Sequence, residues 1–237
     1  MDVVVGYTTY IDLIKPLVVD KKIISTAMKK EVDRIAAAIE QALAGESCAI
    51  VSSGDAGVYA MAGLTLEMCA KKELIIAMPG YEYATKDRQP DLLVEVVPGI
   101  PALCSGAALL GAPLTHDFAA ISLSDLLTPW ETIEKRLEAA ASADFVMVLY
   151  NPKSKKRGWQ LKKAQEIALK HRDGQTPVGI VTNAMREGQT VSIVKLSELH
   201  LAPVNMLTTV FIGNSNTFEY LSFLITPRGY DKKYGLD

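Results

Sequence analysis

Short apolar, strand-like runs alternate with amphipathic helical patterns along almost the whole chain, and this alternation constrains the fold more than any other feature. Between residues 27 and 43, apolar residues recur at three- and four-residue steps, as on the buried stripe of a helix. The run Cys48–Val51 is apolar on both faces, which is typical of a buried parallel strand. The alternation therefore favours an α/β fold with mostly parallel sheets covered by helices.

The same pattern predicts the other elements and the domain organisation. Further helices are expected over residues 58–71, 102–108, 132–141 and 159–170. Further strands are expected over residues 3–5, 74–78, 92–97, 145–150, 178–182, 190–194 and 208–212. Because these elements fall into two halves, we predict two α/β domains, residues 1–113 and 114–237.

The composition is that of a globular chain and argues against several classes of protein. Hydrophobic residues make up 49% and charged residues 22% of the 237 residues, and the formal net charge is -2. A chain of this length buries roughly 70–75% of its unfolded surface, so it folds without a disulfide or a structural metal. The balanced charge argues against a nucleic-acid-coating protein, which needs a basic surplus. No apolar run approaches the ~18 residues of a membrane span and no signal peptide is visible, so we expect a cytoplasmic protein.

Common catalytic and metal-binding motifs are missing from the sequence. There is no GxxxxGK(S/T) phosphate loop, no GxGxxG dinucleotide loop, no HExxH and no GxSxG. The cysteines and histidines are widely spaced and form neither a disulfide framework nor a CxxC pair. We therefore expect no metal site, and the informative signals come instead from the ends of predicted strands.

Four segments at predicted strand ends carry polar or glycine-rich chemistry: residues 53–57, 97–102, 150–157 and 182–188. Ligands of α/β sheets bind outside the carboxyl ends of the strands, where glycines allow close backbone approach. A carboxylate such as that of Asp55 accepts hydrogen bonds from such ligands. Each segment also has a purely structural interpretation. Asp55 could cap a helix, the proline–glycine pair could form a type II turn, and the basic run could be a solvated face.

Taken together and in order, these segments resemble one family. The blocks are SGDAGVYAMAG, VEVVPGIPA, GAPLTHDFAAISLSDLLTPWE, VLYNPKSKKR, VTNAMREGQ and MLTTVFIGNSNT, and they are similar to those of the tetrapyrrole methylases. Within that family, ISLSDLLTPWE and YNPKSKKR resemble the precorrin-3B C17-methyltransferases of cobalamin biosynthesis. The resemblance extends over residues 2–229 and implies two α/β domains, a homodimer, and S-adenosylmethionine in the cleft between the domains.

The resemblance also implies site residues, carried over by position. The implied cofactor-binding residues are Ser53, Gly54, Asp55, Val58, Pro101, Ala102, Asn151 and Ala184. The small side chains among them leave room for a flat adenine. Tetrapyrrole precursors carry many carboxylates, so cations are expected to bind the substrate. The candidates are Lys155, Lys156, Arg157 and Arg186.

The sequence departs from the family pattern in three places. Pro101 stands where a threonine or serine often follows PGI, so a side-chain hydrogen bond is lost there. The stretch over residues 73–91 is longer than usual. Family members normally begin with a strand ending in a GxGPG loop, whereas this chain begins on Asp2-Val3-Val4-Val5. We therefore expect the first domain to lack that strand and loop.

The activity implied by the resemblance is methyl transfer from S-adenosylmethionine to carbon 17 of precorrin-3B or cobalt-factor III, coupled to ring contraction. Ring contraction moves protons, and His116 is the candidate acid or base, with a structural hinge contact as the alternative. Two other functions stay open. One is methylation of a different corrinoid carbon or of a uroporphyrinogen; the other is a binding protein impaired by the missing loop. A dinucleotide oxidoreductase is disfavoured because GxGxxG is absent.

Overall fold

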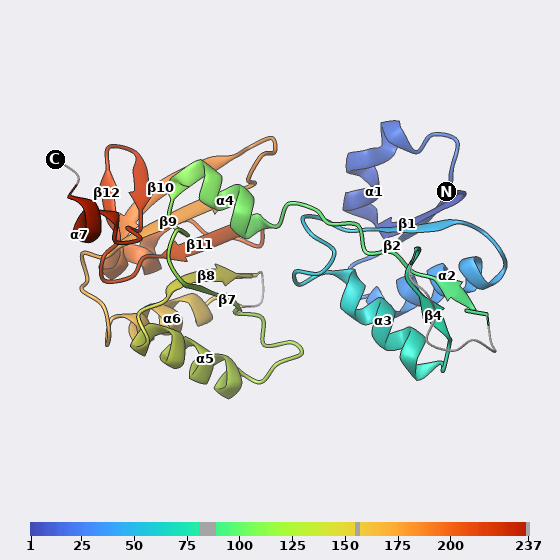
Figure 1. The fold of residues 1–237 in the computed structure, drawn as a ribbon, viewed down its shortest axis with the longest axis horizontal. Coiled ribbons are helices and arrows are strands. Elements are labelled where there is room, and N and C mark those ends of the chain that lie inside the picture. The colour runs from blue at the N-terminus through green and yellow to red at the C-terminus, as the bar shows by residue number, and fades with distance from the viewer. Residues whose placement is uncertain (81–88, 155–156, 236–237) are drawn as a thin grey trace. The chain divides into compact units, whose positions relative to one another are not determined.

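The structure is a computed structural model that describes residues 1–80, 89–154 and 157–235. Its contacts divide the chain into two units, Met1–Pro101 and Ala102–Asp237 (Figure 1). Each unit combines sheets with helices, so the predicted α/β class is confirmed. The domain boundary after residue 113 stays a prediction, since the contact division falls before the helix that begins at Ala102.

The first unit contains a three-stranded parallel sheet in the order β2-β1-β3. Its elements are β1 (Val3–Tyr7), α1 (Thr8–Ile14), the 3-10 helix η1 (Lys15–Leu17), β2 (Lys22–Thr26), α2 (Glu31–Leu43), β3 (Cys48–Val51), α3 (Met61–Lys71), β4 (Ile76–Ala77) and β5 (Leu92–Leu93). The central strand β1 is apolar on both faces because helices cover both. Val3 and Val5 pack with Ala38 of α2, and Val4 packs with Ile11 of α1.

The strands β4 and β5 are much shorter than the predicted runs 74–78 and 92–97. The two strands pair in parallel with each other over two residues each. A cavity of about 400 Å³ is lined by residues 92–97, by Cys48, Ala49 and Ile50 of β3, and by side chains of α2 and α3. A strand is defined by its backbone hydrogen bonds to a neighbouring strand. The apolar pattern of residues 92–97 did not by itself make all of them part of β5.

The second unit is built on a five-stranded sheet in the order β10-β9-β11-β8-β7. Its elements are α4 (Ala102–Leu110), β6 (Gly111–Ala112), β7 (Phe118–Ser122), α5 (Trp130–Ser142), β8 (Val146–Tyr150), α6 (Gln160–Ala168), β9 (Pro177–Thr182), β10 (Thr190–Lys195), η2 (Leu196–Leu201), β11 (Thr208–Ile212), β12 (Phe218–Tyr220), β13 (Phe223–Ile225) and α7 (Tyr230–Tyr234). A smaller sheet has the order β12-β13-β6.

The expectation of mostly parallel strands is wrong for this five-stranded sheet. Only β7 and β8 pair in parallel, whereas β10 with β9, β9 with β11, and β11 with β8 are antiparallel. The connection from β9 to β10 covers only residues 183–189, which is too short for a crossover helix. Strands that are joined without an intervening helix, such as β9 and β10, therefore pair antiparallel.

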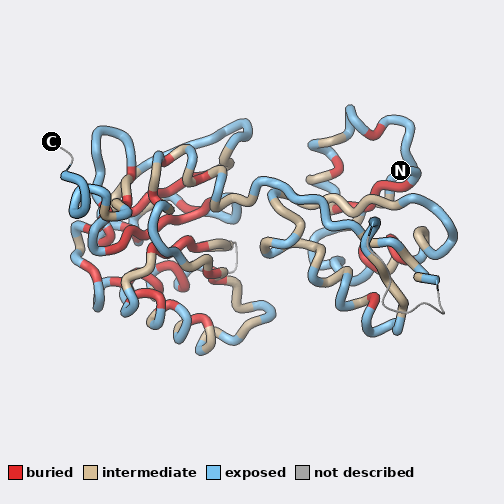
Figure 2. The backbone as a smooth tube through the Cα atoms, in the orientation of Figure 1, coloured by how far each residue is buried: buried red, intermediate tan, exposed pale blue. Residues whose placement is uncertain are grey.

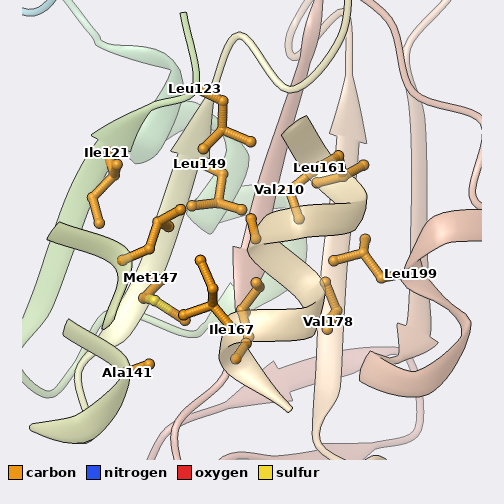
Figure 3. Packing of buried hydrophobic residues seen from close by; sticks show 14 of the residues in the cluster. Ile121, Leu123, Ala141, Met147, Leu149, Leu161, Ile167, Val178, Leu199 and Val210 are labelled. Atoms are coloured by element: carbon orange, nitrogen blue, oxygen red, sulfur yellow. The ribbon is translucent and has the colours of Figure 1, made fainter. Parts of the chain in front are cut away.

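The five-stranded sheet has helices on both faces. Alternate side chains of β8 point to opposite faces, so Met147 and Leu149 belong to one buried cluster and Val148 to the other. Figure 3 shows the first cluster, in which Met147 and Leu149 lie beside Ile167 of α6. On the other face, Val148 packs with Leu110 of α4. Figure 2 shows how buried positions concentrate along these strands.

The predicted helices of the second half are confirmed, with shifts of a few residues at their ends. Several elements were not predicted, among them α1, β2, β7, the paired strands β12 and β13, and α7. None of the helices in the described part of the chain combines the length and apolar character that crossing a membrane requires.

Candidate functional site

In the first unit, the side chain of Asp55 joins two of the segments singled out from the sequence. Asp55 lies in the loop after β3, and its Oδ2 accepts a hydrogen bond from the Gly99 N–H at 2.9 Å, 44 residues further along the chain. Its Oδ1 accepts from the Gly57 N–H at 2.8 Å. Hydrogen bonds from the Gly99 and Gly57 backbone lower the pKa of Asp55 below its usual value. The carboxylate is therefore held in its ionised form at the junction of the two loops.

This geometry decides between the two interpretations of Asp55. Helix α3 begins at Met61, its N-cap position is Ala60, and no side chain caps it. Asp55 is thus not a helix cap. It forms a tight local turn with Gly57 and, in addition, holds a second loop.

The two loops touch so closely that only glycine fits at position 99. A Cβ atom on Gly99 would lie 2.1 Å from the Gly54 carbonyl oxygen and 3.3 Å from the Asp55 Cα. Gly54 itself has φ 77°, a left-handed conformation that favours glycine. The predicted residues Gly54 and Asp55 therefore meet the loop that leads to Pro101, and Ser53 directly precedes them. Val58 closes the turn, and its N–H donates to the Asp55 carbonyl at 3.3 Å.

In the second unit, Asn151 follows β8 directly and adopts the left-handed conformation, with φ 52°. Its Nδ2 donates to the Ser122 Oγ at 3.0 Å, at the end of the neighbouring strand β7. The preceding residue, Tyr150, accepts a hydrogen bond at its hydroxyl oxygen from the Leu103 N–H at 2.8 Å. This bond brings the start of α4, where Ala102 lies, to the carboxyl end of β8.

The loop after β9 also begins with a residue in the left-handed backbone conformation. Asn183 and Met185 have φ of 52° and 58°, and between them Ala184 packs, partly buried, against the cluster that contains Val181 and Phe211. The Asn183 N–H donates to the Leu207 carbonyl at 3.1 Å, which fixes the end of the strand. Asn151 and Ala184 thus each occupy the turn that directly follows a strand of the same sheet.

The four predicted substrate-binding cations have different surroundings. Lys155 and Lys156 lie outside the described residues. Arg186 is exposed on the loop after β9. Arg157 is only 9% exposed, and its Nη1 donates to the Leu123 carbonyl at 2.9 Å. Its Nε lies 3.8 Å from the Asp125 Oδ1, so the guanidinium is occupied by groups of its own unit.

His116 lies in the second unit between β6 and β7, and its side chain is 46% exposed. Its Nδ1 accepts a hydrogen bond from the Asp117 N–H at 2.8 Å, which leaves the proton of the neutral ring on Nε2. Thr115, next to it, donates from its hydroxyl to the Thr226 carbonyl. The ring therefore sits on an anchored segment and is held through Nδ1.

Ser122, Asp125, Tyr150 and Gln160 surround these loops but were not singled out individually from the sequence. Ser122 and Asp125 lie in the ISLSDLLTPWE block. The family resemblance rested on this block as a whole and assigned no role to either residue. Gln160 donates from Nε2 to the Asp125 Oδ2 at 3.1 Å. No cluster of three or more His, Cys, Asp or Glu side chains suited to a metal ion occurs among residues 1–80, 89–154 and 157–235.

Comparisons with known proteins agree on one family. The family described as Tetrapyrrole (Corrin/Porphyrin) Methylases matches residues 1–200. The chain is 49% identical to a cobalt-factor III methyltransferase of Priestia megaterium, over 100% of this chain and 42% of that protein. It is 44% identical to a probable cobalt-factor III C(17)-methyltransferase of Salmonella typhimurium, over 97% of this chain and 88% of that protein.

A solved structure, that of the methyltransferase CobJ, is similar with a TM-score of 0.80 and 34% identity, covering 95% of this chain and 88% of that one. The cobalt precorrin-4 methyltransferase CbiF shares the fold, with a TM-score of 0.66 and 18% identity over 90% of this chain and 83% of that chain. The chain thus spans less than half of the Priestia protein and most of the Salmonella protein.

Proposed function

Since the chain belongs to the tetrapyrrole methylase family, we propose that it transfers a methyl group from S-adenosylmethionine to carbon 17 of a corrinoid precursor in cobalamin biosynthesis. The observation that carries this proposal is the 44% identity to the Salmonella C(17)-methyltransferase across 88% of that protein. The names of the Priestia and Salmonella relatives favour cobalt-factor III over precorrin-3B as the substrate. Methylation is coupled to contraction of the macrocycle.

The predicted cofactor-binding residues fit S-adenosylmethionine chemically. When bound, this cofactor supplies an activated methyl group on a positively charged sulfonium. Asp55 presents an ionised carboxylate that suits a cationic ligand, and backbone hydrogen bonds keep its pKa low. Val97 and Ile100, 66% and 71% exposed, flank Pro98 and Gly99 and offer apolar surface for a flat adenine ring.

The residues of this chain act chiefly by positioning. Holding two reacting groups in line removes several kcal/mol from a barrier because their translational entropy is lost on binding, before reaction. The Asp55–Gly99 hydrogen bond fixes two loops of the first unit, and the Asn151–Ser122 bond fixes the loop after β8 in the second.

Proton movement during ring contraction is assigned to His116, whose side chain is 46% exposed. Arg186 is the exposed candidate for a substrate carboxylate. The proposal includes a homodimer and a cytoplasmic location, supported by the family resemblance and by the composition.

The cofactor part of the proposal is tested by calorimetric titration with S-adenosylhomocysteine. We expect saturable binding at one site per chain, and a loss of affinity in Asp55→Ala. A folded protein without detectable binding favours a binding protein of the pathway over an enzyme.

The substrate part is tested by incubating the protein and S-adenosylmethionine with cobalt-factor III, precorrin-3B, uroporphyrinogen and a precursor already methylated at carbon 17. We expect turnover of the first, with weaker or no turnover of the others. Turnover of the already methylated precursor alone contradicts the assignment to carbon 17.

A further inference from the structure

Arg157 is a buried cation at the carboxyl end of β8, and its contacts are with backbone and carboxylate groups rather than with solvent. Its Nη1 donates to the Leu123 carbonyl at 2.9 Å and lies 3.4 Å from the Asn151 carbonyl, to which it also donates. Its Nε faces the Asp125 carboxylate at 3.8 Å. One guanidinium therefore links the loop after β8 to the segment after β7.

A second layer of contacts holds this guanidinium in place. Gln160, 1% exposed at the start of α6, donates from Nε2 to the other oxygen of Asp125 at 3.1 Å. The backbone of Arg157 exchanges hydrogen bonds with Ser154 at 2.9 and 3.2 Å, which closes the loop on itself. A buried charge is tolerated only when such partners surround it.

Asn151 is consequently held from two sides. Its side-chain amide donates to the Ser122 Oγ, and its carbonyl accepts from Arg157. Both partners contact the segment after β7, since Arg157 also binds Leu123. A residue other than glycine keeps a left-handed φ of 52° when its surroundings fix it in this way.

We propose that Arg157 is a positioning residue that fixes Asn151 in its left-handed conformation at the cofactor-binding loop of the second unit. This inference rests on the proposed function and replaces the expectation that Arg157 binds the substrate directly. Nη1 reaches both the Leu123 and the Asn151 carbonyl, while Nε faces the Asp125 carboxylate. A lysine ammonium has no second nitrogen for Asp125, so lysine reproduces this arrangement only in part.

The chain offers a matched control in Arg172, a second buried arginine of the same unit. Its guanidinium donates to the Ala141 and Phe145 carbonyls at 2.7 and 3.0 Å and pairs with Asp144 at 3.0 Å. Phe145 precedes β8, whereas Asn151 follows it, so the two arginines serve opposite ends of one strand. Substitution of either arginine is expected to lower the stability of the protein. Only substitution of Arg157 removes a contact with Asn151.

The first measurement is hydrogen exchange of the free protein in the peptide covering residues 150–154, which needs no ligand. We expect Arg157→Gln and Arg157→Lys to exchange faster there than the wild type, with Arg172→Gln unchanged in this peptide. Unchanged exchange in both Arg157 variants overturns the proposal. The lysine variant, which keeps the charge, covers the case in which the glutamine variant does not fold.

The second measurement is the affinity for S-adenosylhomocysteine of variants shown by circular dichroism to be folded. We expect Arg157→Gln to bind about tenfold more weakly, and Arg172→Gln to bind within about twofold of the wild type.

In an Asn151→Gly background, where a left-handed φ is unstrained, the Arg157→Gln effect should nearly vanish. Additive effects of Asn151→Gly and Arg157→Gln contradict positioning through Asn151. A wild-type protein that fails to bind contradicts the proposed function, and the exchange measurement still decides the role of Arg157.

Discussion

Asp55 accepts hydrogen bonds from backbone N–H groups of two loops, and this single carboxylate brings the residues 53–57 and 97–102 together. The hydrogen bond from Gly99, followed by that from Gly57, lowers its pKa. A carboxyl with a lowered folded-state pKa stabilises the fold fully above its unfolded pKa. That contribution is lost as the pH falls through the folded value.

We therefore predict that Asp55→Asn lowers the melting temperature at neutral pH, because an amide has only one oxygen to accept from Gly57 or Gly99. The difference from the wild type should shrink as the pH is lowered below about 4. Thermal melts of both proteins between neutral and acidic pH measure this. A difference that stays constant down to the lowest pH contradicts the assigned role of the charge.

Gly99 gives a second prediction at this scale. A methyl group at Gly99 would lie 2.1 Å from the Gly54 carbonyl oxygen, so Gly99→Ala must push the two loops apart. We expect binding of S-adenosylhomocysteine to weaken by about tenfold or more. Gly63→Ala is the matched control, because nothing lies within 4 Å of its Cβ position in α3. That control should bind normally and gain up to about 1 kcal/mol of stability.

At the scale of elements, α4 packs on the five-stranded sheet through two glycines. A Cβ on Gly106 of α4 would lie 2.7 Å from the Phe211 ring, and one on Gly179 of β9 would lie 2.4 Å from Leu110. The close approach buries Leu110 and Phe211 completely. These glycines set the distance between the helix and the sheet.

We predict that Gly179→Ala lowers the free energy of unfolding by about 1–3 kcal/mol, since the added methyl overpacks Leu110. Leu110→Ala alone should also destabilise, through the cavity that it leaves. The double variant should be more stable than the sum of the two losses implies, because the new methyl enters the space that Leu110 vacated. Urea unfolding of the four proteins measures the coupling, and strict additivity contradicts this packing.

Strongly periodic elements were predictable from the sequence, and elements fixed by their neighbours were not. The helix α2 was predicted because its apolar residues repeat along one face, and Ile35 and Ile39 are indeed buried. The strand β2 is largely exposed, so it carries no apolar pattern and exists through its pairing with β1. The strand β5 ends at Leu93 although residues 94–97 continue the pattern.

The same distinction applies to the candidate site. Asp55, Gly99 and Asn151 lie in segments that the sequence marks as strand ends. Asn151 directly follows β8 and Asp55 lies in the loop after β3, whereas Gly99 lies six residues beyond the end of β5. The hydrogen bonds between Asp55 and Gly99 and between Asn151 and Ser122 join residues distant in the chain. The spacing of residues in a single sequence does not reveal which distant residues form such hydrogen bonds. For the same reason, the sequence did not reveal that Arg157 is buried, because it stands in a run of basic residues.

At the scale of the whole molecule, the proposed homodimer makes a direct prediction. Light scattering coupled to size exclusion should give about twice the chain mass of 25.7 kDa. The hairpin β12–β13 exposes apolar side chains, including Tyr220 at 60% and Leu221 at 76%, and is a candidate for the contact. Leu221→Lys should then favour the monomer. A wild-type mass equal to one chain contradicts the dimer.

The proposed activity of this chain is methylation of carbon 17 of the macrocycle. Incubation with cobalt-factor III and S-adenosylmethionine labelled with carbon-13 on its methyl group, followed by NMR of the isolated product, tests it most directly. We predict one labelled methyl per product molecule, attached to carbon 17 of a contracted ring. A label on any other carbon, or an unchanged substrate with a protein that binds S-adenosylhomocysteine, would contradict it.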